Sequence, residues 1–229
     1  MLGDSYMQGM FIGDDDTPPE CLRRYLEKER KTRVSLANGG VMGYSPEQYY
    51  YTMLALAERI RPHFVVVSVC ANDFGNFFDA VSKGVADWKE GKYWLEKIAV
   101  YCKKRRWPCL FVMVPPQPAL MVRRNSGYFP GLVINNLDVD SRLMLDPMDD
   151  FLNAHLRLRV EAERRGETPK ECLLFNYPLN DYHFFPAGSV VWAESVGRRV
   201  LLLLDDVRLY DRSDDRAGGT PRPVGEGPT

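Results

Sequence analysis

The sequence is poor in the residues that usually hold metals and disulfides. Its three histidines, His63, His155 and His183, form no close pair, and its five cysteines form no Cys-x-x-Cys motif. Zinc sites draw on closely spaced ligands of these types, and a complete disulfide framework needs an even number of cysteines. We therefore expect no metal ion and no other cofactor, and we expect reduced thiols, as in a cytoplasmic protein.

The sequence also lacks a long apolar run and an imbalance of charge. No stretch reaches the roughly 18 apolar residues that a membrane-spanning helix needs. Lys and Arg (30) nearly balance Asp and Glu (31), which gives a formal net charge of -1. A near-neutral chain with interleaved charges gives no electrostatic reason to expect nucleic acid or an anionic membrane as a partner. We expect neither partner, and the oligomeric state stays open.

No basic and then apolar leader precedes Gly3, because only Met1 and Leu2 come before it. As it stands, the sequence is that of a cytoplasmic protein. Because only two residues precede Gly3, an export signal further upstream stays open as an alternative. For the same reason we expect that the first strand of the fold is largely truncated.

Helix and strand patterns alternate along the chain. Of the 229 residues 45% are apolar, which suits one domain with a sizeable core. Periodicity and capping signals predict helices at 18–31, 46–60, 93–106, 146–165 and 186–204, and strands at 33–37, 63–70, 109–114 and 172–175. This order predicts an α/β protein with three α/β/α layers and a parallel central sheet. Ligand sites in such folds lie beyond the carboxyl ends of the strands.

We place the domain at 1–206 and expect a disordered tail at 207–229, which is rich in Gly and Pro and has few apolar residues. The segment 118–146 is too long for an ordinary connection, and we expect it to be an insertion or a lid loop. Within it, Tyr128 and Phe129 are candidates to line a substrate pocket. The alternative is that the two rings only pack the loop.

Polar side chains follow four of the expected strands. Ser5 comes after the first strand, a glycine turn after the second, Asn72 after the third, and Asp181 and His183 after the last. A serine hydroxyl becomes a good nucleophile when an imidazole takes its proton and an acid orients that imidazole. The carboxamide and the backbone N–H groups can stabilise the resulting oxyanion. These residues therefore favour an ester hydrolase.

Other residues have structural explanations that we prefer. Ser45 opens the capping box Ser45-Pro46-Glu47-Gln48, which engages its hydroxyl, so it is a poor rival nucleophile. Thr17 to Glu20 form a second capping box. The acidic run at 14–16 suits the start of the following helix better than a magnesium site. We expect His63 and His155 to be structural or solvated.

Four short blocks resemble those of the SGNH hydrolases, the GDSL-type serine esterases and lipases. They are Gly3-Asp4-Ser5, the Asn-x-Gly-x-x-Gly of 38–43, Ala71-Asn72-Asp73 and Asp181-Tyr182-His183, in the order of that family. The resemblance implies a flavodoxin-like α/β/α fold. It also implies Ser5 as nucleophile with Asp181 and His183 as its triad partners, and Ser5, Gly43 and Asn72 as oxyanion donors.

The sequence departs from the family pattern in two of the blocks. Cys70 stands where the third block usually has glycine, so the backbone there is expected to turn less tightly. The usual spacing of the last block would place Asn180 at the position of the acid. A shorter Asp-x-His form also occurs, and because it fits Asp181 we assign the acid to that residue.

The function that we expect is a serine ester hydrolase that cleaves small or medium acyl esters, O-acylated carbohydrate among them, through an acyl-enzyme. Its partners are then small-molecule or carbohydrate esters. One alternative with the same chemistry is acyl transfer to a sugar hydroxyl. Another is a non-catalytic carbohydrate-binding protein that retains the fold, which the altered third block favours and the complete Ser, His and Asn set opposes.

Overall fold

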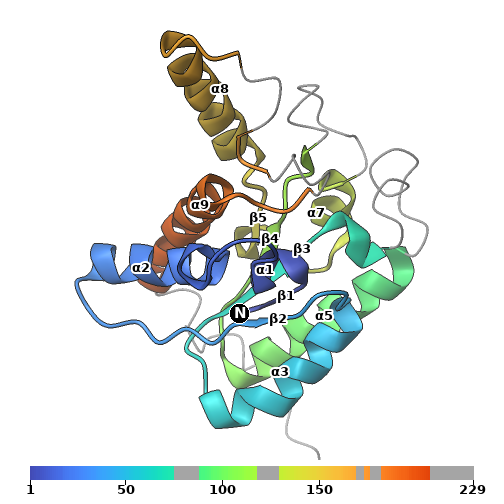
Figure 1. The fold of residues 1–229 in the computed structure, drawn as a ribbon. Coiled ribbons are helices and arrows are strands. Elements are labelled where there is room, and N and C mark those ends of the chain that lie inside the picture. The colour runs from blue at the N-terminus through green and yellow to red at the C-terminus, as the bar shows by residue number, and fades with distance from the viewer. Residues whose placement is uncertain (75–87, 118–128, 169–172, 176–181, 207–229) are drawn as a thin grey trace, which may run out of the picture.

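The computed structural model describes residues 1–74, 88–117, 129–168, 173–175 and 182–206 of the chain. Strands and helices alternate around one central sheet (Figure 1). The strands are β1 (Leu2–Gly3), β2 (Gly39–Gly40), β3 (Val65–Val69), β4 (Cys109–Met113) and β5 (Met144–Leu145). The α-helices are α1 (Ser5–Gln8), α2 (Pro18–Arg30), α3 (Pro46–Ile60), α5 (Trp88–Arg105), α7 (Gly131–Asn136), α8 (Met148–Arg164) and α9 (Pro186–Asp205).

The five strands form one parallel sheet in the order β2-β1-β3-β4-β5. This is the strand order of flavodoxin-like folds. β3 and β4 pair along their full length, from Val65 with Cys109 to Val69 with Met113. β1 pairs with β3 only at Leu2 and Val67. The predicted three-layer fold with a parallel sheet is confirmed, and the first strand has only two residues.

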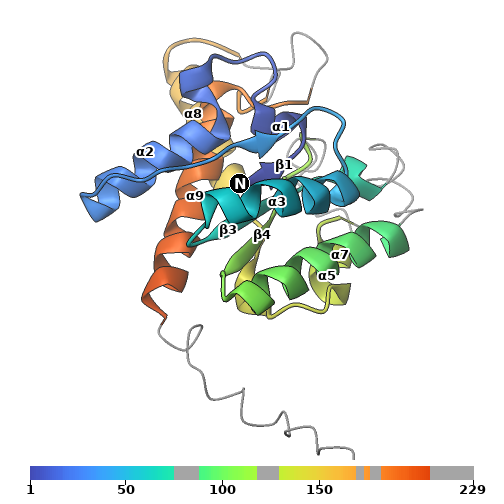
Figure 2. The same ribbon diagram turned by 90° about the horizontal axis from the view of Figure 1, so that it is seen from below.

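Helices cover both faces of the sheet, and the strand residues alternate between the faces. Val66 and Val112 belong to one apolar cluster with α2, α8 and α9, whereas Val67 and Phe111 belong to a second cluster with α3, α5 and α7. Figure 2 shows these two helical layers on opposite sides of β3 and β4. Because both faces are covered, the central strands are almost entirely apolar, as their sequences predict, with the buried Ser68 of β3 as the exception.

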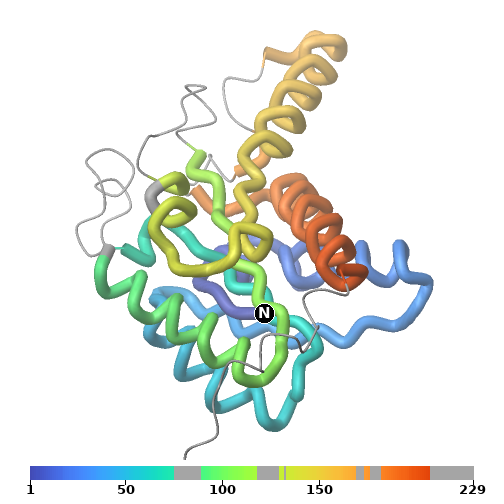
Figure 3. The backbone as a smooth tube through the Cα atoms, turned by 180° about the vertical axis from the view of Figure 1, so that it is seen from behind, coloured from blue at the N-terminus to red at the C-terminus, as the bar shows by residue number. Residues whose placement is uncertain are grey.

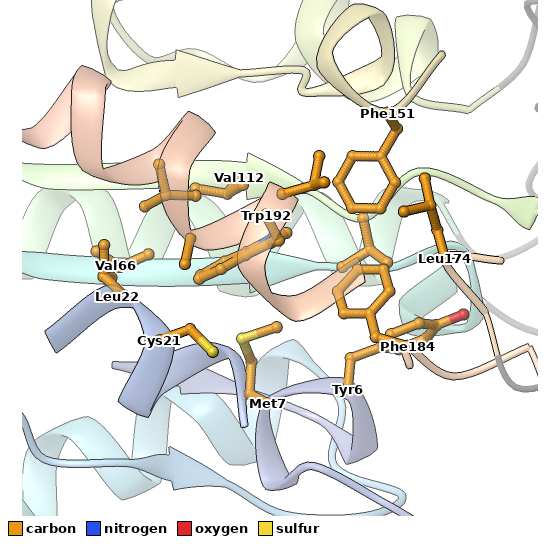
Figure 4. Close-up of a cluster of buried hydrophobic side chains, with 14 of the residues drawn as sticks. Tyr6, Met7, Cys21, Leu22, Val66, Val112, Phe151, Leu174, Phe184 and Trp192 are labelled. Atoms are coloured by element: carbon orange, nitrogen blue, oxygen red, sulfur yellow. The ribbon is translucent and has the colours of Figure 1, made fainter. Parts of the chain in front are cut away.

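The cluster on the side of α9 carries much of the aromatic core (Figure 4). Trp192 and Phe151 are fully buried in it, and the ring of Phe184 lies 5.4 Å from that of Phe151. Burial of side chains of this size contributes about 1.5–3 kcal/mol each. Tyr6 lies at the edge of the cluster with its ring 5.0 Å from Phe184, so the core continues directly to the residue after Ser5.

Helix α1 lies directly on β1 and β2, because two glycines leave room for it. A Cβ atom added to Gly3 would lie 2.4 Å from Cγ of Met7, and one added to Gly40 would lie 2.6 Å from Cβ of the same residue. Met7 is fully buried at this contact. Larger residues at Gly3 or Gly40 would push α1 away from the sheet.

Two expected strands differ from the structure. Residues 33–38 have no regular structure, and the ladder at this edge of the sheet begins at Gly39. Phe175 forms only an isolated antiparallel bridge with Phe184, and Cys172 lies outside the described residues. The fifth strand is instead β5, which lies in the segment 118–146. It consists of only two residues beside β4, too few for a periodic pattern to be visible in the sequence.

The helices agree better with the sequence, because their starts carry recognisable capping signals. α3 has the predicted capping box, in which the side chain of Gln48 accepts from the Ser45 N–H at 2.9 Å. The capping box predicted at Thr17 to Glu20 is wrong. The Thr17 hydroxyl donates to the Asp14 carbonyl oxygen in the short helix η1 (Asp14–Asp16), and it makes no capping hydrogen bond to α2. α8 projects beyond the rest of the fold at its carboxyl end (Figures 1 and 3).

Two further features of the fold are an apolar pocket and the apolar character of the helices. An apolar pocket of about 520 Å³ lies at the amino-terminal ends of β1 and β3, where Leu2, Phe64 and Val66 line it. Neither Ser5 nor His183 lines this pocket. Among the described helices, none combines the length and the apolar character that crossing a membrane requires.

Candidate active site

Ser5 lies at the carboxyl end of β1, where the chain turns from strand into helix. Asp4 is the N-cap residue of α1, and its Oδ1 atom accepts a hydrogen bond of 3.0 Å from the Tyr6 N–H. Aspartate is a favoured N-cap residue because its carboxylate binds such free N–H groups. The turn fixes Ser5 as the first residue of α1, with 6% of its surface exposed.

The side chain of His183 meets this serine. Its Nε2 atom lies 2.6 Å from Oγ of Ser5, although the two residues are 178 positions apart in the sequence. At this distance the hydroxyl and the imidazole form a hydrogen bond, with the serine as donor when Nε2 carries no proton. The structure therefore brings together the two residues that the sequence proposed as nucleophile and base.

Tyr6 holds the loop that carries His183. Its hydroxyl donates to the Tyr182 carbonyl oxygen at 2.9 Å, and its ring lies 4.7 Å from the imidazole. After His183, Phe184 forms its bridge with Phe175, and α9 begins at the proline two positions later. The imidazole is thus fixed from both sides along the chain, by the tyrosine and by the start of α9.

The second carboxylate oxygen of Asp4 connects the turn that carries Ser5 to the residues 70–73 of the third block. Oδ2 accepts from Nδ2 of Asn72 at 3.1 Å and from Sγ of Cys70 at 3.3 Å. Asp4 is almost fully buried, so these charge-assisted bonds replace its contact with water. A carboxamide has two N–H donors, and among the described residues only Asp4 takes one, so the other can donate to a ligand.

Cys70 begins a turn that is closed by a backbone hydrogen bond. Its carbonyl oxygen accepts from the Asp73 N–H at 3.1 Å, and the short helix η2 (Ala71–Phe74) follows at once. Its φ is not in the left-handed region, so glycine's freedom is not needed here. The expectation of a looser turn than in the usual glycine form stays a prediction. The thiol also contacts Oδ1 of Asn72, and burial raises its pKa well above the usual value.

The glycine turn of the second block is held against α1 by two amide side chains. Nδ2 of Asn38 donates to the Met7 carbonyl oxygen at 2.9 Å, while its Oδ1 accepts from the Gly40 N–H at 2.9 Å. Oε1 of Gln8 accepts from the Met42 N–H at 2.7 Å. These bonds fix the loop after β2 beside the helix that begins with Ser5.

Gly43 has a φ of 78°, a backbone conformation that favours glycine. It lies in an exposed turn, which is closed by a hydrogen bond from the Tyr44 N–H to the Val41 carbonyl oxygen. Within the described parts of the chain, the Gly43 N–H has no hydrogen-bond partner, and neither has the Ser5 N–H. Both groups are free to donate to a ligand. Their expected role as oxyanion donors stays a prediction.

A second buried carboxylate, that of Asp73, supports the same turn. It accepts from the Tyr49 hydroxyl at 2.8 Å and from the Cys70 N–H at 2.8 Å. Burial raises the pKa of Asp73 well above its usual value, and the nearby charge of Asp4 raises it further. Burial likewise raises the pKa of Tyr49. Asp73 therefore favours its protonated form more than an exposed carboxyl group would.

The remaining candidates lie apart from this cluster or outside the described residues. Asp181, Asn180 and Tyr128 are in the latter group, so the acid of the triad stays a prediction. Phe129 is fully buried with its ring 6.3 Å from that of Phe74, and its proposed substrate contact also stays a prediction. Across the part of the chain with assigned structure, no cluster of His, Cys, Asp or Glu could hold a metal ion.

Sequence reasoning missed three residues that position the site: Asp4, Tyr6 and Gln8. For Asp4 a signal existed, because aspartate directly before a helix is a common N-cap. For Tyr6 and Gln8 no local signal exists, since their partners lie 176 and 34 positions away.

Solved structures with a similar fold include lipolytic proteins and esterases. No protein-family model and no curated protein matches the chain. One is a putative lipolytic protein of the G-D-S-L family from Desulfitobacterium hafniense, with 13% identity and a TM-score of 0.56 over 86% of this chain and 96% of that one. Another is the acetyl xylan esterase AlAXEase, with 16% identity and a TM-score of 0.58 over 87% and 97%. A third is the esterase EstA from Pseudoalteromonas sp., with 13% identity and a TM-score of 0.58 over 90% and 97%. The chain therefore has an SGNH hydrolase-like fold.

Asp4→Asn is expected to lower the free energy of unfolding by about 1.5–3 kcal/mol, the range for a lost hydrogen bond to a charged group. Asparagine can still cap α1, but it presents an N–H group where Asn72 and Cys70 need an acceptor. Urea unfolding measures the change. Asp140→Asn is the matched control, because Asp140 is also an N-cap residue but is exposed. Equal losses in the two variants would contradict the proposed central role of Asp4.

Asp73→Asn is expected to flatten the dependence of stability on pH. Because the folded pKa of Asp73 is raised above its usual value of 3.8, the folded protein holds a proton that the unfolded chain releases. The free energy of unfolding of the parent protein therefore falls as the pH rises above that value, until the folded carboxyl group also ionises. Urea unfolding of both proteins at several pH values measures this, and parallel curves would contradict it.

Proposed function

We propose that the protein is a serine hydrolase that cleaves small or medium acyl esters through an acyl-enzyme. The observation that carries the proposal is the 2.6 Å distance between Oγ of Ser5 and Nε2 of His183. A serine hydroxyl in contact with an imidazole is the arrangement of an activated nucleophile. An ordinary turn serine has no need for such a partner from the other end of the chain.

In the first half of the reaction, Oγ of Ser5 attacks the ester carbonyl carbon and its proton passes to Nε2 of His183. The carbonyl oxygen becomes an oxyanion, to which the N–H groups of Ser5 and Gly43 and the free N–H of Asn72 donate. The intermediate then collapses, the bond to the alcohol breaks, and the imidazolium returns the proton to the leaving oxygen. The acyl group remains on Ser5.

In the second half, a water molecule attacks the acyl-enzyme and gives its proton to the same imidazole. The second tetrahedral intermediate releases the carboxylic acid and restores the serine hydroxyl. We assign the orientation of the imidazole to Asp181, which would accept from its other nitrogen. Tyr6 complements this role, because it holds the loop and the ring in place.

The substrate class that we propose is a small or medium acyl ester, O-acylated carbohydrate included. Support for the carbohydrate comes from the acetyl xylan esterase among the similar structures. The segment 118–146 is the proposed substrate-binding insertion, with Tyr128 and Phe129 as its candidate contacts. The metal-free chemistry of Ser5 and His183 needs no cofactor.

A fluorophosphonate probe is expected to label the folded protein at Ser5, as seen by mass spectrometry of the digested adduct. Ser5→Ala removes the label. In a separate measurement of ester hydrolysis, His183→Ala lowers the rate by a factor of about 10⁴ to 10⁶, because the Ser5 hydroxyl then has no base. Ser45→Ala is the matched control and keeps full labelling, because that hydroxyl belongs to the capping box of α3.

A folded protein that the probe does not label would overturn the hydrolase proposal and favour a binding protein. Labelling without release of acid from a simple ester, but with transfer of the acyl group to an added sugar, would favour the transferase.

Asn72→Ala is expected to lower kcat by about 10² to 10³, the usual effect of one lost oxyanion donor. KM for a small ester changes little, because the donor acts on the charge that develops during the reaction. Steady-state kinetics on a purified, folded variant measure both constants. A rise in KM with unchanged kcat would contradict the assignment and leave Asn72 as a partner of Asp4 alone.

A further inference from the structure

Phe11 contacts the proposed catalytic imidazole from the loop that follows α1. Its ring lies 6.2 Å from that of His183 in an edge-on arrangement, with 75° between the ring planes. The side chain of Phe11 is nevertheless 55% exposed. Tyr6, the other ring beside the imidazole, is buried. Among the described residues, Phe11 is therefore the aromatic side chain at His183 that has a face open to solvent.

The backbone of Phe11 is strained. Its φ is 66°, in the left-handed region, which a bulky residue rarely adopts. The three other described non-glycine residues with positive φ are Lys31, Arg61 and Arg106, and each directly follows the last residue of a helix. Such positions at helix ends often have this conformation, but Phe11 follows no helix directly. Strain at a site of this kind points to function.

The chemistry of the proposed reaction indicates which part of a substrate lies near Phe11. His183 returns its proton from Nε2 to the leaving oxygen, so the alcohol half of the ester must lie against the imidazole. A side chain that contacts this ring and has a free face is placed to touch the alcohol. Aromatic rings bind flat apolar surfaces well, by edge-on or offset stacking.

Resting on the proposed function, we propose that Phe11 determines specificity for the alcohol half of the ester and binds alcohols that present a flat, ring-shaped apolar face. The strained loop holds the ring at the site in advance, so that binding does not have to order it. The acyl half of the substrate makes no use of Phe11.

The test compares two esters of the same acid, phenyl acetate and ethyl acetate. In Phe11→Ala, kcat/KM for phenyl acetate falls by on the order of tenfold relative to the parent protein, which corresponds to one aromatic contact. For ethyl acetate it stays within about twofold, since an ethyl group offers no ring face. Hydrolysis of the acetyl-enzyme, measured after a burst, proceeds at the parent rate because both esters give the same intermediate.

Three further variants separate the ring from the backbone. Phe11→Asn also removes the ring but tolerates the left-handed conformation, so it loses the same selectivity without loss of thermal stability. Phe11→Tyr keeps a ring and keeps the preference for phenyl acetate. Leu202→Ala is the matched control, since Leu202 is an exposed apolar side chain on α9 and its loss leaves both esters unaffected.

Unchanged selectivity in Phe11→Ala and Phe11→Asn would overturn the role of Phe11, and so would an equal loss for both esters. Either result leaves the hydrolase proposal intact, because the parent protein still cleaves both esters. A parent protein that reacts with neither ester nor the phosphonate probe overturns the hydrolase proposal, and the role of Phe11 with it.

Discussion

The buried carboxylate of Asp4 connects the parts of the site that come from different strands. One oxygen caps α1 and so fixes Ser5, while the other accepts from Asn72 and Cys70 at the end of β3. A carboxylate buried to this extent is stable only when hydrogen bonds replace its contact with water. The donors therefore cannot move independently of one another, and the carboxamide of Asn72 and the hydroxyl of Ser5 keep a fixed relation.

The site stands on a very short strand, and side-chain packing helps to hold it. β1 has two residues, too few to hold Ser5 through its ladder alone. Met7 fills the space above Gly3 and Gly40, and Tyr6 extends into the aromatic core beside Phe184. The position of Ser5 thus depends on the packing of α1 as much as on the sheet. This explains why a four-residue helix is so deeply buried.

The sequence predicts those parts of the fold and the site whose signals are local. Long helices with proline at their starts, such as α3 and α9, and the apolar strands β3 and β4 are recognisable from a few adjacent residues. β5 is not, because two residues carry no period and their place depends on the neighbouring β4. The same division holds in the site. Ser5 and His183 are found from ordered motifs, but the bond from Tyr6 to the loop of His183 depends on the tertiary fold.

The cysteine in the third block shows how a site accepts a departure from its usual sequence. Glycine is irreplaceable where φ is positive or where a Cβ atom has no room, and Cys70 meets neither condition. Its thiol instead fills the space between Asp4 and Asn72, contacts both, and stays protonated because burial raises its pKa. A neutral donor beside Asp4 adds to the bonds that satisfy this carboxylate. The substitution therefore leaves the carboxamide of Asn72 in place and does not argue against a hydrolase.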